Sequence, residues 1–422
     1  MLQISFIREN NKKVIDGLKK KNFEAAEQQV NELLKIDESR RDTQKNLDDA
    51  LARSNALAKE IGALMKNGRK EEAETVKAET TQLKARAKKL GESLNNYETQ
   101  LNELLIKLPN LPHKSVPAGL LPENNELVYQ HGKIPELKDA LPHWELIKKY
   151  DIIDFETGNK IAGAGFPVYK GKGARLQRAL INFFLEEGIK AGYTEVQPPI
   201  FVNRASAYAT GQLPDKEGQM YHIGEDDLYP IPTAEVPITN MYRDVILKED
   251  ELPVKIVGYT PCFRREAGSW GAHVRGLNRL HQFDKVEIVQ IRHPDNSYHA
   301  LEEMCSHVQG LLKKLQLPYR VLKLCGGDIS FTAALTYDME VYSAAQQKWL
   351  EVSSVSNFES FQANRLKLRC KGKDNKNFLL HTLNGSALAL PRLVAAMLEN
   401  NQTKEGIRMP EVLHEYCGFE MI

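Results

Sequence analysis

The sequence predicts an α+β fold: an antiparallel β-sheet with flanking helices, preceded by an N-terminal antiparallel two-helix coiled-coil arm. Residues 27–108 contain no proline and are rich in Ala, Leu, Lys, Glu and Gln, which is the composition of long helices. Apolar residues recur there every three or four positions, the spacing of a coiled coil. After residue 144, short apolar runs follow one another without an obligatory helix between them, which favours antiparallel pairing.

The second half of the arm carries the clearer coiled-coil stripe. Its members are Ala73, Val76, Thr80, Leu83, Ala87, Leu90, Leu94, Tyr97, Leu101, Leu104 and Leu108. The first half carries a looser stripe of Val30, Leu33, Leu47, Leu51, Ala58, Ile61 and Met65, interrupted by Asp37, Arg40, Gln44 and Ser54. Lys66 to Arg69 contains Asn and Gly, which favour a reversal of the chain. Two helices of about forty residues would each extend about 60 Å. Taken alone, such a rod fits a dimerisation coil or a bundle hairpin.

Prolines at 109, 112 and 117 end the second helix and indicate a linker. We therefore expect an N-terminal domain at 1–108, with its arm at about 27–108, a linker at 109–143 and a second domain at 144–422. The expected helices of that domain are Gly173 to Lys190, Tyr298 to Gln316 and Leu390 to Asn400. The expected strands are Val254 to Phe263, Leu280 to Ile291, Tyr319 to Leu324, Thr336 to Tyr342, Trp349 to Val355 and Phe378 to Leu383.

Composition limits the classes of function and partner. The 422 residues carry 57 Lys and Arg against 56 Asp and Glu, a net charge of +1, so any polyanion must be bound by local patches. The chain has no apolar run long enough to span a membrane and no signal-peptide core at its start, so we expect a cytoplasmic protein without a membrane partner. The five cysteines are far apart and predict reduced thiols, in preference to a metal site; no zinc is expected.

Two expected strands place an unusual set of side chains on one face. Strand alternation puts Arg264 and Glu266 together. On the second strand the same rule aligns Arg279, His281, Phe283, Lys285 and Glu287. If the strands form a hairpin with residues 267–278 as its loop, arginines, carboxylates and a ring share one surface. A solvated face with cross-strand ion pairs is the alternative, but an exposed Phe283 argues against it. Arginines and a ring suit a nucleotide, through phosphate binding and stacking.

Two further segments offer phosphate chemistry. Glu351, Ser353 and Ser354 supply hard oxygen atoms suited to Mg²⁺. Glu351 and Ser354 have opposite strand parity, so both reach one ion only if a bulge or a strand end redirects one of them. Arg392 is expected near the start of a helix, where Pro391 is tolerated and phosphate is favoured. An arginine that merely caps a core helix is the alternative.

Together these segments resemble the signature motifs of class II aminoacyl-tRNA synthetases, and the whole chain resembles the bacterial-type seryl-tRNA synthetases. Gly192 to Pro199 matches motif 1, Phe263 to Phe283 matches motif 2, Asn384 to Arg392 matches motif 3, and Thr233 to Glu235 matches the amino-acid-binding TxE element. The resemblance implies a six- to eight-stranded antiparallel catalytic domain and a homodimer with motif 1 at its interface. It also implies that the arm binds the long variable arm of tRNA(Ser) held by the other subunit, and reading RNA shape needs few phosphate contacts.

The resemblance further implies an ATP-dependent ligase that converts L-serine to seryl-adenylate and transfers the seryl group to the 3′ end of tRNA(Ser), and possible use of tRNA(Sec). Arg264 and Arg392 are the implied catalytic residues. The implied ATP-binding residues are Arg264, Arg265, Glu266, Phe283, Glu351, Val352, Ser353, Ser354 and Arg392. Glu351 and Ser354 are the implied Mg²⁺ ligands. The implied serine-binding residues are Thr233, Ala234, Glu235, Arg279, Glu287, Asn384 and Ser386.

The chain departs from the family pattern at two places. Ala272, His273 and Val274 stand in the motif 2 loop where a basic residue and Asp-Thr are usual, and Leu390-Pro391 replaces small residues before Arg392. Two other functions compete: an amino-acid-activating paralogue that loads a carrier protein, which would not need the arm, and a non-catalytic RNA-binding scaffold on a degenerate fold. The presence of Arg264, Arg392 and Glu351 disfavours the scaffold.

Overall fold

The computed structural model describes residues 1–215, 218–266 and 274–422. They form two compact units. One contains residues 2–19 and 23–109, and the other contains Met1, residues 20–22 and residues 110–422. The segment 109–143, expected to be a linker, lies almost entirely in the second unit, where it contributes a strand.

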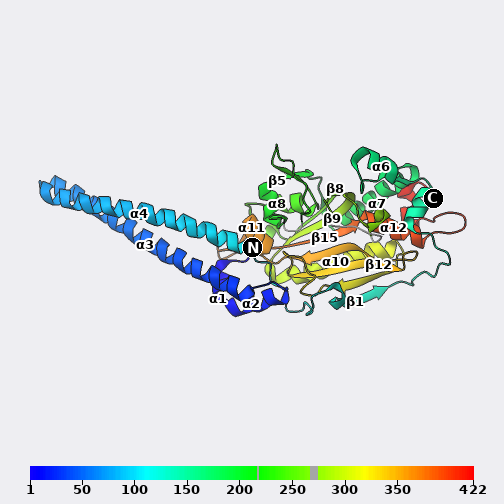
Figure 1. Ribbon diagram of the computed structural model, residues 1–422, viewed down its shortest axis with the longest axis horizontal. Helices are drawn as coiled ribbons and strands as arrows, with labels where there is room; N and C mark the ends of the chain where they lie inside the picture. Colours follow the sequence, from blue (N-terminus) through cyan, green and yellow to red (C-terminus); the bar gives the residue numbers. More distant parts are fainter. Residues whose placement is uncertain (216–217, 267–273) are drawn as a thin grey trace. The chain divides into compact units, whose positions relative to one another are not determined.

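The first unit is helical. Its helices are α1 (Ile4–Glu9), α2 (Asn11–Lys20), α3 (Ala26–Lys66) and α4 (Lys70–Leu105). The two long helices α3 and α4 lie side by side as an antiparallel hairpin (Figure 1). The chain reverses at Asn67 and Gly68: the Asn67 amide donates to the Ala63 carbonyl at 3.1 Å, and Gly68 has a φ of 77°. The expected coiled-coil arm is confirmed.

The packing stripe of α4 is the expected one, but that of α3 differs from the prediction. Leu51 and Met65, expected in the seam, are each 46% exposed, and Ala58 is also exposed. The seam instead contains residues one position earlier and Ser54, which was expected to interrupt it. Its buried members in this half are Ala50, Ser54, Leu57 and Leu64. In a heptad repeat, the seam positions are alternately three and four residues apart. In α3 the successive seam positions 44, 47 and 50 are each three residues apart, which moves the later seam positions one residue earlier.

Asp37 shows how the seam accommodates a charge. Its side chain is 1% exposed and accepts hydrogen bonds from Arg8 at 2.8 Å, Arg40 at 3.0 Å and Arg41 at 3.2 Å. Burial raises the pKa of Asp37, but the hydrogen bonds from Arg40 and Arg8 outweigh it and hold the pKa below its ordinary value. The carboxylate therefore joins α1 to α3.

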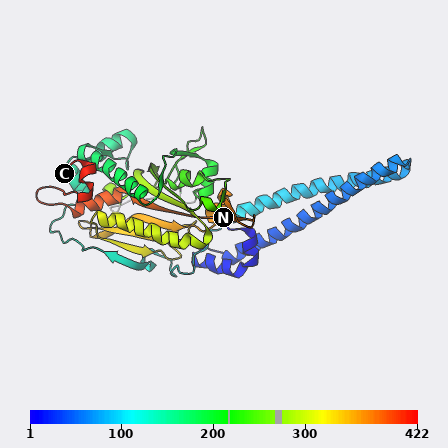
Figure 2. The same ribbon diagram turned by 180° about the vertical axis from the view of Figure 1, so that it is seen from behind.

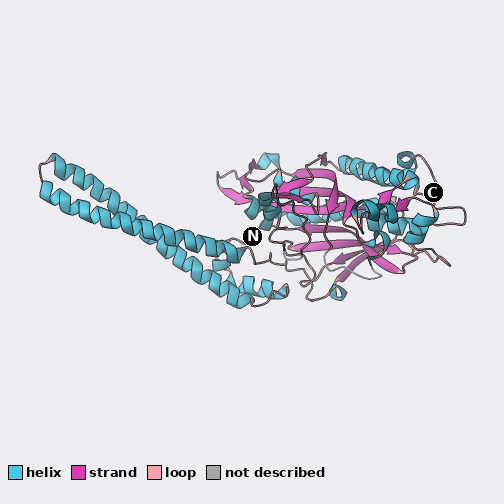
Figure 3. Cartoon of the chain, turned by 45° about the horizontal axis from the view of Figure 1, so that its top comes forward, coloured by secondary structure: helices cyan, strands magenta, loops and turns pink. Residues whose placement is uncertain are grey.

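The second unit is built on an eight-stranded sheet with the order β1-β10-β11-β12-β15-β9-β8-β4. The strands of this unit are magenta in Figure 3. The strands of the eight-stranded sheet are β1 (Glu126–His131), β4 (Thr194–Glu195), β8 (Val254–Phe263), β9 (Gln282–Arg292), β10 (Tyr319–Lys323), β11 (Leu335–Ser343), β12 (Lys348–Asn357) and β15 (His381–Ala389). All neighbours pair antiparallel except the short edge strand β4, which runs parallel to β8. The predicted antiparallel α+β fold is confirmed.

Smaller sheets lie beside the main one, and one of them corrects an expected strand. They consist of β14 (Asn377–Leu379), β13 (Arg369–Lys371) and β7 (Ile246–Lys248); of β2 (Ile153–Asp154) and β3 (Val168–Tyr169); and of β5 (Phe201–Asn203) and β6 (Leu228–Pro230). The run Phe378 to Leu383, expected to be one strand, is divided between β14 and β15. Leu380 separates the two strands and is itself buried in a small core.

Helices cover the sheet and fix which strand residues face the core. The helices are α5 (His143–Lys149), α6 (Phe155–Ala162), α7 (Gly171–Lys190), α8 (Arg204–Thr210), α9 (Glu235–Asn240), α10 (Ser297–Lys314), α11 (Phe361–Leu366), α12 (Leu390–Asn400) and α13 (His414–Cys417). Helix α10 lies along β12 and β15 (Figure 2). Val286 and Ile288 of β9 join its core, whereas Val289 packs with Ile238 of α9. Odd-numbered residues of β9 therefore face away from α10.

Two general expectations can be compared with the described residues. All five cysteines are buried and unpaired. In the part of the chain that the structure describes, no helix is both long and apolar enough to cross a membrane.

Candidate active site

The site is built on the β8–β9 hairpin. The two strands pair antiparallel, with Cys262 opposite Phe283 and Gly258 opposite Glu287. The pairing continues beyond the end of β8, because the Arg264 amide donates to the His281 carbonyl at 2.9 Å. The hairpin expected from the sequence is therefore present, with its charged face on the side away from α10.

Arg264 and Phe283 meet on this face. The guanidinium carbon of Arg264 lies 5.2 Å from the centre of the Phe283 ring, within cation–π range. Arg264 Nε also donates to the Pro232 carbonyl at 3.4 Å, and the neighbouring Arg265 amide donates to the Gln219 carbonyl at 2.9 Å. Backbone contacts thus hold the arginine beside a half-buried ring.

Glu266 and Arg279 form an ion pair across the hairpin. Glu266 has a φ of 49°, so the strand alternation ends before it, and its amide donates to Gln219 Oε1 at 3.1 Å. The alternative considered from the sequence, a cross-strand ion pair, therefore describes this pair correctly. The following loop residues Ala272 and His273, at which the chain departs from the family pattern, lie outside the described residues.

A buried polar cluster lies farther along β9. Lys285 is 5% and Glu287 2% exposed, and the two form a salt bridge. Lys285 Nζ donates to Thr233 Oγ1 at 2.8 Å, and Thr233 Oγ1 donates to Glu287 Oε2 at 3.2 Å. Ala234, next to Thr233, is fully buried. The cluster offers a carboxylate and a hydroxyl in a largely water-free setting.

Glu235 adds a second carboxylate. It is 8% exposed and accepts a hydrogen bond from Gln362 Nε2 at 2.5 Å. Burial, reinforced by the charge of Glu287, raises the pKa of Glu235 to about 7. The buried Asn384 side chain lies close enough to Glu235 to oppose this rise. The buried cation Lys285 also opposes this rise, and a second cation at the site would stabilise the charged form of Glu235 further.

The sequence required a bulge or a strand end to bring Glu351 and Ser354 to one side, and the structure has a bulge. On β12, Ser353 pairs with Met339 and Glu351 pairs with Glu340, so Val352 is the extra residue between them. Consequently Glu351 is exposed and Ser354 half-buried, whereas Val352 and Ser353 are buried. Ser353 Oγ donates to the Ser386 carbonyl at 2.6 Å, which ties β12 to β15.

Asp338 of β11 pairs with Ser354 on the adjacent strand β12. The Oδ1 atom of Asp338 is buried without a hydrogen-bond partner among the described residues. Burial, followed by the charge of Glu351, raises the pKa of Asp338, and a hydrogen bond from Ser354 opposes this rise. Hard oxygen atoms with an unmatched acceptor fit a divalent cation. Among the described residues, no group of three or more His, Cys, Asp or Glu side chains is arranged as a metal site.

Arg392 is the third residue of α12, which begins at Leu390 with Pro391 in its first turn. A proline there requires no amide donor, so the unusual Leu390-Pro391 leaves the expected helix start unchanged. Arg392 Nε donates to the Asn278 carbonyl at 3.0 Å, and its Nη1 donates to the carbonyl and carboxylate of Glu351 at 3.2 and 3.3 Å. The guanidinium therefore does more than cap its helix: it joins β12 to the motif 2 segment.

The predicted site residues thus fall into local clusters on adjacent strands. Ser386 of β15 pairs with Glu287 of β9, and Asn384 pairs with Ser356 of β12, which brings the clusters onto one sheet surface. Sequence reasoning did not assign a role to four residues that the structure adds: Asp338, Asn278, Lys285 and Gln362. Of these four, only Lys285 could have been found from the sequence, because strand alternation places it on the same face as Phe283 and Glu287.

Motif 1 lies at the β4 edge of the sheet, and its Val196 packs against the small core that contains Ala234. Glu195, Val196 and Gln197 line a cavity of about 490 Å³ together with residues of α7 and with Tyr259 and Asp284.

The comparisons with known proteins agree with this fold. Residues 220–401 match the family model of the tRNA synthetase class II core domain (G, H, P, S and T), and residues 1–112 match that of the seryl-tRNA synthetase N-terminal domain. The chain therefore contains the core domain of a class II aminoacyl-tRNA synthetase.

Full-length relatives narrow the class to one family. The chain is 51% identical to a serine--tRNA ligase of Salinibacter ruber, over 100% of this chain and 99% of that protein. It superposes with a TM-score of 0.94 on the seryl-tRNA synthetase of Pyrococcus horikoshii, solved in complex with ATP, at 34% identity and with 100% and 99% of the two chains covered. The TM-score is 0.90 with the cytoplasmic serine-tRNA ligase of Naegleria fowleri, solved with AMP, at 25% identity and with 100% and 98% covered. The chain belongs to the seryl-tRNA synthetase family.

Proposed function

We propose that the protein activates L-serine with ATP and transfers the seryl group to the 3′ end of tRNA(Ser) in the cytoplasm. The observation that carries this proposal is the pairing of Arg264 with Phe283 on the same sheet face as the buried Thr233–Lys285–Glu287 cluster. The first pair suits a nucleotide, and the second suits a small polar amino acid. The family's full-length relatives support the same activity.

For ATP, Phe283 stacks on the adenine and Arg264 binds the α-phosphate. Arg392, at the start of α12, covers the other side of the adenine and reaches the γ-phosphate, where helix dipole and guanidinium act together. Glu266 lies on the adenine side, and residues 351–354, including Val352 and Ser353, line the nucleotide. Each arginine is already fixed by backbone carbonyls, so little side-chain freedom is lost on binding.

Glu351 and Ser354 would hold Mg²⁺, with Asp338 beside them. Bound there, the ion would neutralise charge on the phosphates. The chain's own contribution is the bulge at Val352, which places the carboxylate and the hydroxyl on the same open side of the sheet.

For serine, Glu235, Glu287 and Thr233 meet the ammonium and the hydroxyl, Asn384 and Ser386 line the pocket, and Arg279 binds the carboxylate. The serine carboxylate then attacks the α-phosphorus in line, the bond to the leaving pyrophosphate breaks, and seryl-adenylate forms. Arg264 stabilises the charge that develops on the α-phosphate oxygens. Orientation and charge neutralisation supply most of the acceleration, because no side chain becomes covalently attached.

We further propose that the α3–α4 arm binds tRNA(Ser) and that the protein is a homodimer with motif 1 at its interface. We also propose that the N-terminal domain, linker and catalytic domain follow the boundaries 1–108, 109–143 and 144–422, with the linker adding β1 to the sheet of the catalytic domain. The β4 edge and its cavity support the position of the dimer contact. Use of tRNA(Sec) as an additional substrate belongs to the same proposal. Sedimentation of the full chain tests the homodimer.

The direct test is exchange of labelled pyrophosphate into ATP. We expect exchange that depends on serine and is abolished in Arg264→Ala. Exchange with a different amino acid, and none with serine, would overturn the assignment. Absence of ATP binding by calorimetry would instead favour the non-catalytic scaffold.

A second experiment separates tRNA charging from loading of a carrier protein. Deletion of residues 27–105 removes most of α3 and α4. A tRNA ligase should then still form adenylate but lose tRNA charging. An amino-acid-activating paralogue that loads a carrier protein should keep its whole activity.

A further inference from the structure

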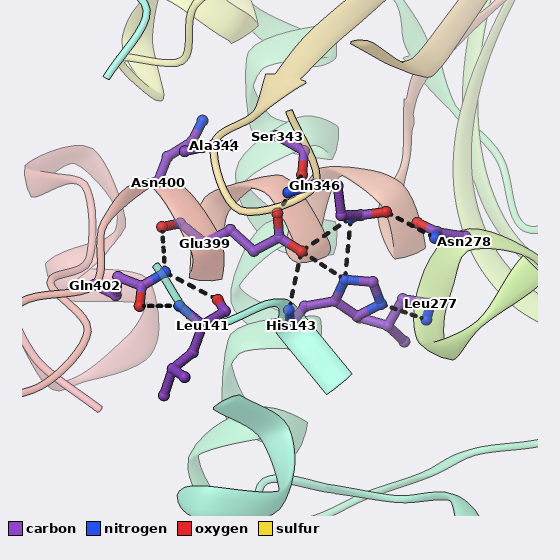
Figure 4. Close-up of polar contacts among 10 residues, drawn as sticks. All are labelled: Leu141, His143, Leu277, Asn278, Ser343, Ala344, Gln346, Glu399, Asn400 and Gln402. Atoms are coloured by element: carbon purple, nitrogen blue, oxygen red, sulfur yellow. Dashed lines mark hydrogen bonds and ion pairs between the residues drawn. The ribbon is translucent and has the colours of Figure 1, made fainter. Parts of the chain in front are cut away.

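A buried hydrogen-bond network joins four segments that are distant in the sequence (Figure 4). At its centre are His143 and Glu399, both fully buried. His143 Nδ1 lies 2.8 Å from Glu399 Oε1, and the His143 backbone amide donates to the same oxygen at 2.9 Å. Ser343 Oγ donates to the other carboxylate oxygen. Burial raises the pKa of Glu399, but these hydrogen bonds outweigh it and keep the pKa below its ordinary value.

The second nitrogen of His143 defines its tautomer. The Leu277 backbone amide donates to His143 Nε2 at 2.9 Å, so Nε2 is an acceptor and carries no proton. The proton must then lie on Nδ1, where it is donated to Glu399. His143 is therefore a neutral bridge from the end of α12 to the backbone at Leu277.

Leu277 belongs to the return segment of the motif 2 loop, residues 274–278, which leads directly into Arg279. This segment is held tightly against α5. Gly276 has a φ of +66°, and a Cβ at this position would lie 2.3 Å from His143 Nε2. The guanidinium carbon of Arg275 lies 4.8 Å from the ring centre of Trp144, the residue after His143.

The network also reaches Arg392. Asn278 Nδ2 donates to Gln346 Oε1 at 2.9 Å, and Gln346 Nε2 donates to Glu399 Oε1 at 2.9 Å. The Asn278 carbonyl accepts the hydrogen bond from Arg392 Nε at 3.0 Å. Arg392 and Glu399 lie about two turns apart on α12. The return segment is thus hydrogen-bonded to α12 at both residues, directly to Arg392 and through Gln346 to Glu399.

We propose that His143 is a positioning residue of the active site: held by Glu399, it fixes the return segment and through it the guanidinium groups of Arg279 and Arg392. This inference rests on the proposed function, because the proposed function assigns the substrates that these two arginines bind. His143 itself touches no substrate. Its role is to keep the guanidinium groups of the two binding arginines at fixed positions relative to each other. Small displacements of such groups lower the rate of catalysis strongly.

Two substitutions at His143 separate its two hydrogen bonds. The amide of Asn in His143→Asn occupies the region of Nδ1, keeping the bond to Glu399 and losing the acceptor for Leu277. The longer His143→Gln brings an amide oxygen to the region of Nε2 and restores that acceptor. We expect His143→Asn to raise the KM for ATP and for serine about tenfold in pyrophosphate exchange, and His143→Gln to stay within about threefold of the wild type.

A second readout does not require catalysis. Hydrogen exchange followed by mass spectrometry should show faster exchange of peptides spanning 274–283 in His143→Asn than in His143→Gln or the wild type. The matched control is His381→Asn, which removes a half-buried histidine bonded to Ser297 Oγ at 2.8 Å. This control should leave the exchange of 274–283 unchanged.

The outcomes distinguish the two proposals. If both His143 variants lower the melting temperature equally and leave the KM values unchanged, the role of His143 is purely structural and the inference is overturned. Unchanged hydrogen exchange of residues 274–283 in His143→Asn would overturn it as well. A wild-type protein without serine-dependent pyrophosphate exchange would overturn the proposed function instead, and the hydrogen-exchange comparison would still decide whether His143 fixes the return segment.

Discussion

The guanidinium of Arg264 lies over the ring of Phe283, 5.2 Å from carbon to ring centre, at the point where β8 ends and the motif 2 loop begins. The arginine is 19 residues before the phenylalanine, and the antiparallel register brings them together. A ring with a cation beside it provides both a stacking surface and a phosphate ligand. The nucleotide part of the proposed site depends on this pair.

Replacing Phe283 should weaken ATP binding without affecting serine. Stacking on an aromatic ring contributes about 1 to 3 kcal/mol, so we expect Phe283→Ala to raise the KM for ATP roughly 5- to 150-fold in pyrophosphate exchange. Phe283→Leu keeps most of the apolar volume and loses the π-face, so it should show a similar rise. A Leu variant with wild-type KM would mean that the ring does not stack on the base.

Serine binding should depend on pH through Glu235. Because burial raises its pKa to about 7, the carboxylate is only partly ionised at neutral pH. We expect the KM for serine to fall as the pH rises through 7, and this dependence to be absent in Glu235→Gln. A serine KM that is flat between pH 6 and pH 8 in the wild type would contradict an ammonium ligand at this position.

The same group links stability to pH, with a defined sign. A raised pKa in the folded state means that the contribution of Glu235 to stability is complete below its unfolded pKa, about 4.3, and is lost as the pH rises through about 7. We therefore expect the free energy of unfolding of Glu235→Gln, measured in urea relative to the wild type, to rise by on the order of 1 to 3 kcal/mol between pH 5 and pH 8.5. The exposed Glu225→Gln is the matched control and should show no such gain.

Magnesium dependence should follow from the bulge at Val352. Loss of the Glu351 carboxylate removes a charged oxygen ligand, so Glu351→Gln should raise the Mg²⁺ concentration for half-maximal exchange about tenfold or more. Mn²⁺ binding in the presence of a non-hydrolysable ATP analogue, followed by electron paramagnetic resonance, should weaken in parallel. Ser356→Ala, on the same strand but bonded to Thr336 at 2.8 Å, is the control. Equal effects of both variants would place the ion elsewhere.

In the arm, Asp37 should be a stabilising residue despite its burial. Asp37→Asn leaves three arginines without their carboxylate, and we expect a loss of about 1 to 2 kcal/mol at pH 7, reduced from the value of a fully buried pair because the arginines are partly exposed. Thermal unfolding and hydrogen exchange of residues 2–60 measure it. The exposed Asp42→Asn should be close to neutral.

The pH dependence of this contribution has the opposite sign to that of Glu235. The pKa of Asp37 is lowered in the folded chain, so its stabilisation is present above its ordinary value and disappears as the pH falls through the lowered one. The difference between Asp37→Asn and the wild type should therefore vanish in strong acid. A difference that persists there would point to packing rather than charge.

Some of these relationships follow from the sequence alone, because they depend on local periodicity. The helical repeat located the arm and its reversal at Asn67 and Gly68, and strand alternation placed Phe283, Lys285 and Glu287 on one face. The opposite parity of Glu351 and Ser354 indicated that a bulge or a strand end must redirect one of them if both are to reach one ion. Proline rules placed the start of α12 at Leu390.

The tertiary structure alone decided where distant segments meet. The phase slip that buries Leu57 instead of Ala58 depends on how α4 packs against α3, and the bulge falls at Val352 because β11 sets the register of β12. The bond from His143 to Leu277 joins residues more than a hundred positions apart, and no local repeat encodes such a contact. Periodicity along a chain specifies which side a residue faces, whereas its partner is chosen by packing and hydrogen bonding among all the segments that reach that side.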